Sequence, residues 1–213
     1  MLVEPGEPVL ADAMPSWQAA AHARNLTSAA LRMGYRLDFH GAQYLLGDTA
    51  LLIVTPCEAM LASAVLHAFV PRPVHVIANA AMMSALPARA LSSAGDIEAV
   101  DPGCVDAQRR GLAALLDDRP VAVAGALAPR AFLAAMSGAP VAPVVIFGAE
   151  GKVVTDPPRP RARISVYAFE PIAIDVHGDP LRPATRAAVE EQIRQAVADA
   201  QALAGLRSGR LTG

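Results

Sequence analysis

Lysine is nearly absent from this chain, because Lys152 is the only one among its 18 cationic residues and all the others are arginine. The formal net charge is −2, and no lysine-rich stretch is present. The sequence therefore lacks the basic stripe that follows a phosphate backbone, and we exclude sequence-independent nucleic-acid binding as its main function.

Aromatic residues are also scarce, at 4% of a chain that is 54% hydrophobic. Alanine supplies much of the apolar content, and Leu, Val and Ile supply most of the rest. A core built from such small side chains suits helices packed closely on a sheet. The 213 residues are enough for one substantial core, and we expect a single domain.

Cysteine is limited to Cys57 and Cys104, which have no C-x-x-C companion and no metal-ligand spacing. The sequence thus predicts a reducing compartment, no bound metal and no cofactor. The first residues lack the pattern of a signal peptide, and no run reaches the roughly 18 apolar residues of a membrane span. We expect a cytoplasmic protein without a transmembrane segment; peripheral contact with the inner face of the membrane remains open.

Strand-like and helix-like segments alternate along most of the chain. This order predicts an α/β fold, with a mostly parallel mixed sheet of about seven strands layered with helices. We expect a flexible lead-in over 1–15, the domain over 16–206 and a short tail over 207–213. Strands are expected at 35–41, 50–54, 70–78, 94–103, 119–125, 142–148 and 163–169, and helices at 16–33, 58–69, 79–91, 104–118, 128–138 and 183–205.

The turn after the strand at 50–54 is where open α/β proteins place their chemistry. Thr55 and Pro56 end that strand and lead into an alanine-rich segment. This turn and the residues after it, 55–62, which we call the corner, contain Cys57, Glu58 and Ala62, but no histidine, aspartate or glycine-rich loop. The corner therefore lies where an active site is expected but lacks the residue types that usually carry out catalysis.

The order of these segments resembles the glycerolipid acyltransferase family, typified by lysophosphatidic acid acyltransferases. The resemblance covers about residues 30–175, and the chain departs from the family pattern in both signature motifs. The segments that carry it are "GYRLDFHGAQYL", "LLIVTPCEAMLASAVLHAFVPRPV", "EAVDPG" and "AFLAAMSGAPVAPVVIFGAE".

The resemblance implies a His-x-x-x-x-Asp motif, in which histidine is the general base, aspartate orients it, and acyl-CoA or acyl carrier protein donates the acyl group. The matching positions hold Cys57 and Ala62. A second motif, Phe-Pro-Glu-Gly-Thr-Arg, would follow the strand at 119–125 and hold the acceptor's phosphate. Here Gly125 leads almost directly into the next helix, and the nearest cation is Arg130, for which we weigh anion binding against a solvated helix residue.

Two kinds of side chain could substitute for the absent base, a cysteine thiol and another histidine. Cys57 could act as a nucleophile, but a thiol needs a base or a positive environment, and the charge of Glu58 would raise its pKa. We therefore interpret Cys57 as a small packing residue. Each of the five histidines belongs to a different segment from the corner or points away from it, and we interpret all of them as core or surface residues: His22, His40, His67, His75 and His177.

The compact basic cluster "PPRPRARIS" contains Arg159, Arg161 and Arg163. It could meet anionic lipid headgroups, or it could be a solvated loop before a strand. Our leading hypothesis is a noncatalytic acyltransferase-like protein that binds a lipid or acyl chain, or pairs with an active paralogue, in lipid metabolism. The alternative is a divergent but active acyltransferase with a relocated base.

Overall fold

A computed structural model describes residues 17–79, 97–100, 104–125, 129–153 and 155–209. The expected lead-in at 1–15, most of the expected helix at 79–91 and the last four residues lie outside this part of the chain. The helices are α1 (Trp17–Gly34), α2 (Ala62–Phe69), α4 (Val105–Leu116), α5 (Pro129–Ser137) and α6 (Pro183–Arg207), with a 3-10 turn η1 (Ala42–Leu45). The strands are β1 (Arg36–His40), β2 (Leu51–Thr55), β3 (His75–Asn79), β4 (Ile97–Val100), β5 (Pro120–Ala124), β6 (Val141–Phe147) and β7 (Arg163–Ala168).

The strands form one seven-stranded sheet in the order β1-β7-β6-β2-β5-β3-β4. The strands from β6 to β4 are mutually parallel, β7 is antiparallel to β6, and β1 is parallel to β7. The predicted mixed, mostly parallel α/β sheet is confirmed. The carboxyl ends of β2, β5 and β6 therefore share one edge with the amino ends of β1 and β7.

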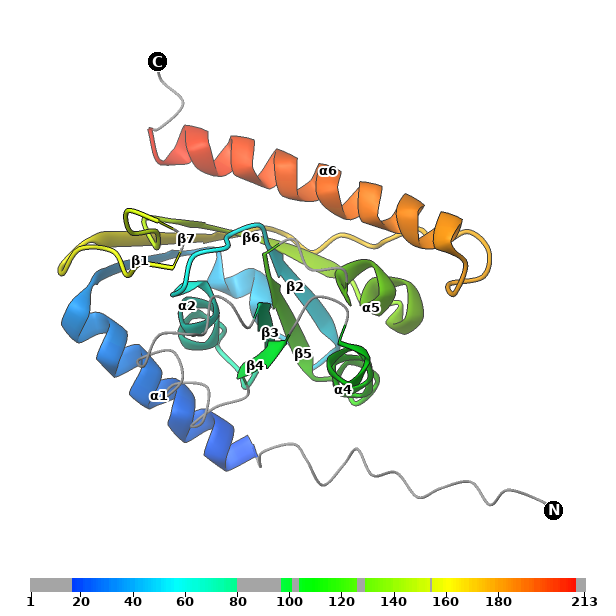
Figure 1. Ribbon diagram of the computed structural model, residues 1–213, viewed down its shortest axis with the longest axis horizontal. Helices are drawn as coiled ribbons and strands as arrows, with labels where there is room; N and C mark the ends of the chain where they lie inside the picture. Colours follow the sequence, from blue (N-terminus) through cyan, green and yellow to red (C-terminus); the bar gives the residue numbers. More distant parts are fainter. Residues whose placement is uncertain (1–16, 80–96, 101–103, 126–128, 154, 210–213) are drawn as a thin grey trace.

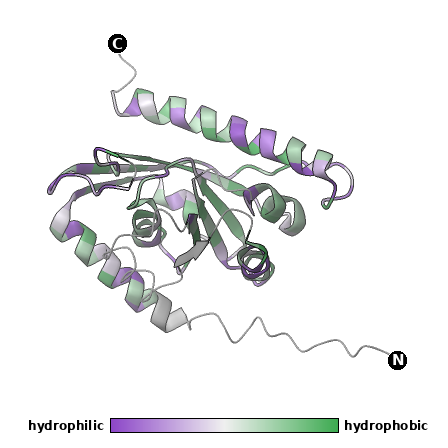
Figure 2. Ribbon diagram, viewed as in Figure 1, coloured by the Kyte–Doolittle hydropathy of each residue, from purple (hydrophilic) through white to green (hydrophobic). Residues whose placement is uncertain are grey.

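Helices cover both faces of the sheet (Figure 1). Alternate side chains of β2 pack on opposite sides: Ile53 belongs to a core with α2, and Leu52 and Val54 belong to a second core with α4, α5 and α6. Figure 2 shows the apolar residues concentrated in the strands and inward helix faces, and polar residues along the loops. The three-layer arrangement follows from central strands that are apolar on both faces.

Helix α2 begins at Ala62, four residues later than the sequence predicted. Pro56 has no amide hydrogen to donate, and the Ala62 amide donates to the Ala59 carbonyl at 2.9 Å in a turn, so residues 56–61 form a non-helical connection. Cys57 consequently lies before the helix and not on its first turn. None of the helices that the structure describes has the length and apolar composition of a membrane span.

Candidate functional site

The corner lies where β2 and β5 end side by side. The Gly125 amide donates a hydrogen bond to the Thr55 carbonyl at 2.9 Å, and the Cys57 amide donates to Thr55 Oγ1 at 3.3 Å. Gly125 has a φ of 82°, a left-handed conformation in which glycine avoids the clash of a Cβ. The structure thus brings Cys57 and Gly125 to the same edge of the sheet.

The Cys57 side chain is buried in the core between the sheet and α2. Burial raises the pKa of its thiol to about 11; the hydrogen bond from the Ala59 backbone opposes this shift, and the charges of Glu150 and Glu58 add to it. The effect of Glu58 has the direction expected from the sequence, but burial is the larger cause. A thiol in this environment is almost fully protonated at neutral pH, so it is neither a general base nor an activated nucleophile.

Ala62 is also buried, with 1% of its surface exposed. It belongs to the same apolar core as Cys57, Ala59, Met60 and Leu61, and Glu58 alone of residues 57–62 has an exposed side chain. The two positions at which the resemblance implies a base and its orienting carboxylate are therefore packed among apolar groups.

The histidines with clear positions do not lie at this corner. His75 begins β3 and His40 ends β1, so both lie at the opposite edge of the sheet. His67 is fully buried in the last turn of α2, which runs back from the corner. Among the described residues, no group of three His, Cys, Asp or Glu side chains could hold a metal ion.

Arg130 is buried, and the expectation of a solvated helix residue is wrong. Its Nε donates to both carboxylate oxygens of Glu190 on α6, at 2.9 and 3.1 Å, and a second guanidinium nitrogen pairs with the same group. The ion pair links α5 to α6. Because Glu190 already neutralises this guanidinium, Arg130 is poorly suited to hold a phosphate.

The fold of the chain is similar to that of a known enzyme, whereas its sequence matches nothing in the other two comparisons. No protein-family model and no curated protein sequence matches the chain. Its structure is similar to the crystal structure of the 1-acyl-sn-glycerophosphate acyltransferase PlsC from Thermotoga maritima, with a TM-score of 0.57 and 16% sequence identity, over 84% of this chain and 79% of that one. The chain has an acyltransferase-like fold.

In this acyltransferase-like fold the loop from β6 to β7 carries the basic cluster. Arg159, Arg161 and Arg163 are exposed, and Arg163 pairs with Asp38 of β1. The loop bounds a hollow of about 670 Å³ that includes Arg159, Arg163, Lys152, Glu150 and Asp156. Because the loop follows the carboxyl end of β6 and the corner follows the carboxyl end of its parallel neighbour β2, the two lie at the same edge of the sheet.

A larger groove, which sequence reasoning missed, lies between α6 and the β6–β7 half of the sheet. Its volume is about 710 Å³. Leu203 of α6 is 47% exposed beside the groove, although the sequence predicts only the helix on which it lies. Apolar lining residues come from four segments of the chain: Tyr44, Pro143, Phe169, Ile172, Ala196, Ala200 and Leu203.

Proposed function

We propose that this protein is a noncatalytic relative of the glycerolipid acyltransferases that binds the acyl chain of a lipid without transferring it. The observation that carries the proposal is the filled corner: Cys57 and Ala62 are packed into the apolar core where the resemblance would place a base and its orienting carboxylate. A positioned general base contributes about 10²–10⁴-fold to a rate, and its pKa must lie near the working pH. A buried thiol with a pKa of about 11 does not meet that requirement.

The residues that would bind the phosphate of the acyl acceptor are also missing from the described part of the chain. The connection from β5 to α5 spans only residues 125–128, which leaves no room for the family's second motif, and Arg130 beyond it is neutralised by Glu190. Positioning an acceptor is worth more than acid–base catalysis in many enzymes, because it replaces a bimolecular encounter by an oriented one. The chain therefore lacks both contributions in its described residues.

The groove under α6 supports acyl binding. Its volume falls in the range of about 300–1,000 Å³ that is typical of small-molecule sites, and its lining is mainly apolar. Glu170, Glu191 and Asp199 line it, and Glu191 forms an ion pair with Arg194. Among the described residues the lining cation is Arg207, whose guanidinium lies 5.3 Å from the ring centroid of Phe169. This excess of acids disfavours a free fatty-acid carboxylate, so the ligand that fits best is an esterified acyl chain.

A binding measurement tests the groove. Ala196 lies on its wall and is partly exposed, so Ala196→Trp should fill the groove without disturbing the core. Ala202 is exposed on the same helix outside the groove, and Ala202→Trp is the matched control. The probe is a lysophosphatidylcholine with a fluorescent acyl chain, measured by fluorescence anisotropy below its critical micelle concentration.

We expect saturable binding that weakens at least about tenfold in Ala196→Trp and is retained in Ala202→Trp. Absence of saturable binding, or equal binding by both variants, would exclude the groove as the acyl site. Acyl transfer to a lysophospholipid would favour the alternative, a divergent but active enzyme.

A further inference from the structure

One end of the molecule gathers exposed cations from segments that are distant in the sequence. We call this surface the basic end and define it by six side chains from α1, β1, the β6–β7 loop and the first residue of β7. All six are exposed: Arg32, Arg36, Lys152, Arg159, Arg161 and Arg163. Figure 1 shows the end of α1, in blue, meeting the β6–β7 loop, in yellow, at the left of the view.

Backbone hydrogen bonds fix these segments together. The Arg161 amide donates to the Gly34 carbonyl at 2.6 Å, and the Arg36 amide donates to the Ala162 carbonyl at 2.9 Å. Arg36 and Arg163 are also register partners in the β1–β7 pair. The backbone pairing therefore holds these cationic residues close together, whichever rotamers their long side chains adopt.

The charge of the basic end differs from that of the whole chain. It holds six of the 18 cationic residues, and three acids of the described part of the chain border it: Asp38, Glu150 and Asp156. Asp38 pairs with Arg163, and no side-chain ion pair is seen for Arg159 or Arg161 within the described residues. A chain with a net charge of −2 thus presents a net positive surface at this end.

Two large apolar side chains stand exposed among these cations. Met33, in the last turn of α1, is 83% exposed, and Val153, beside Lys152, is 57% exposed. Isolated exposed apolar residues are common on protein surfaces. Apolar side chains surrounded by arginines suit an anionic bilayer, because the headgroup phosphates can pair with the cations while the apolar side chains insert at the boundary between headgroups and acyl chains. Nucleic acid would gain nothing from Met33 or Val153.

The loop itself holds the arginines outward. Pro157, Pro158 and Pro160 restrict its backbone, and Arg161 adopts a φ of 64°, in the left-handed region. A stiff loop loses little conformational entropy when it meets a surface.

We propose that the basic end is a docking surface for an anionic lipid bilayer, which places the membrane at the edge of the sheet where the Cys57 corner lies. This inference does not depend on the acyl groove, because it uses other residues at the other edge of the sheet. It assigns Met33 and Val153 to the headgroup boundary and the arginines to the phosphates above it.

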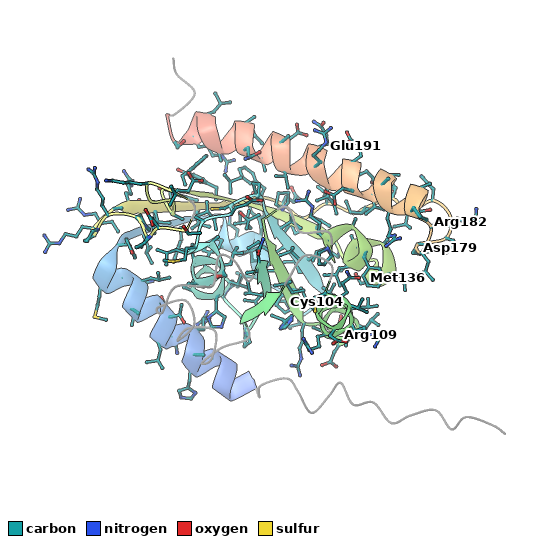
Figure 3. The ribbon with its side chains drawn as sticks, viewed as in Figure 1. Cys104, Arg109, Met136, Asp179, Arg182 and Glu191 are labelled. Atoms are coloured by element: carbon teal, nitrogen blue, oxygen red, sulfur yellow. The ribbon has the colours of Figure 1, made fainter. Side chains whose placement is uncertain are left out.

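Sedimentation with sucrose-loaded vesicles tests the proposal. The vesicles contain phosphatidylglycerol and phosphatidylcholine, and pure phosphatidylcholine vesicles serve as the neutral comparison. The test variant is Arg159→Ala with Arg161→Ala. The matched control is Arg109→Ala with Arg182→Ala, which removes the same charge from exposed positions on α4 and before α6, both away from the basic end (Figure 3).

We expect binding to anionic vesicles only, weakening as salt is raised. Each arginine contributes about fivefold to tenfold to the partition coefficient, so the test variant should lose roughly 30-fold or more, and the control much less. Met33→Gln should also weaken binding, whereas Leu116→Gln, which removes an exposed apolar side chain of α4, should not.

Absence of binding to anionic vesicles, or equal losses in the two double-arginine variants, would overturn the proposal. Binding of an oligonucleotide through the same arginines, with Met33→Gln unchanged, would overturn it in favour of a nucleic-acid surface. A negative result in the vesicle experiment would not affect the proposal of acyl binding, which the comparison of Ala196→Trp with Ala202→Trp tests separately.

Discussion

Cys57 lies at the end of β2, where an α/β fold usually places an active site, but burial in the apolar core keeps its thiol protonated at neutral pH. The sequence indicated its position at the end of β2 and the direction of the effect of Glu58. The interpretation of Cys57 as a small packing residue agrees with its burial. The sequence did not indicate that burial, and not the charge of Glu58, would be the main cause of the raised pKa, because the extent of burial depends on how α2 and the sheet pack around the thiol.

The thiol's raised pKa predicts its reactivity. With a pKa of about 11, the thiolate fraction of Cys57 near pH 8 is roughly a hundredfold below that of an ordinary thiol, and burial adds a steric barrier. In the native protein, iodoacetamide should therefore modify the partly exposed Cys104 well before Cys57. Peptide mass spectrometry measures both rates.

The sign of the pH dependence is a second readout of the same experiment. Because the folded thiol stays protonated until the pH approaches about 11, its alkylation rate should rise roughly tenfold per pH unit from neutral pH upward without levelling. Protein unfolded in guanidinium is the control, in which both cysteines react. A Cys57 rate that levels below about pH 9 would show that the thiol is not buried as described.

At the scale of elements, the strands were more predictable than the helix boundaries. The apolar runs of β2, β3, β5 and β6 indicated strands of one sheet, and the structure joins them. The start of α2 was misplaced because alanine-rich composition favours a helix from Glu58, whereas Pro56 and the turn at Ala59 delay it to Ala62. The groove under α6 was not predictable, since it depends on how that helix lies across β6 and β7.

The delayed start of α2 places Ala62 inside the core, and this predicts the cost of restoring a carboxylate there. Ala62→Asp should destabilise the protein by about 3 kcal/mol or more, because it buries a charge with no partner. Ala184→Asp is the matched control, since Ala184 is exposed in the first turn of α6. Its free energy of unfolding should change by about 0.5 kcal/mol or less.

Chemical denaturation of the two variants measures the difference. Equal midpoints would show that the corner is open to solvent and could accommodate the family's aspartate. The interpretation that Ala62 is packed inside the core would then be wrong.

At the scale of the whole molecule, the sheet has two functional edges in this account. The carboxyl edge of the parallel strands carries the filled corner and the basic end, and the groove under α6 lies toward the other edge. The fold, with its likeness to a Thermotoga maritima acyltransferase, could be predicted from segment order. The ligand-binding surfaces could not, because they join Arg36 to Arg163 and Phe169 to Leu203, pairs that only the folded chain brings together.

The central claim is that an acyltransferase-like fold persists here without acyl transfer. The most direct measurement incubates purified protein with radiolabelled acyl-CoA, or acyl carrier protein loaded with the same chain, and lysophosphatidic acid, and quantifies the diacyl product against heat-denatured protein. We predict no product above the denatured control, because Cys57 and Ala62 provide neither a base nor its orienting group. Product formation above that control would contradict the account, and its loss in Cys57→Ala would show that the buried thiol performs the chemistry.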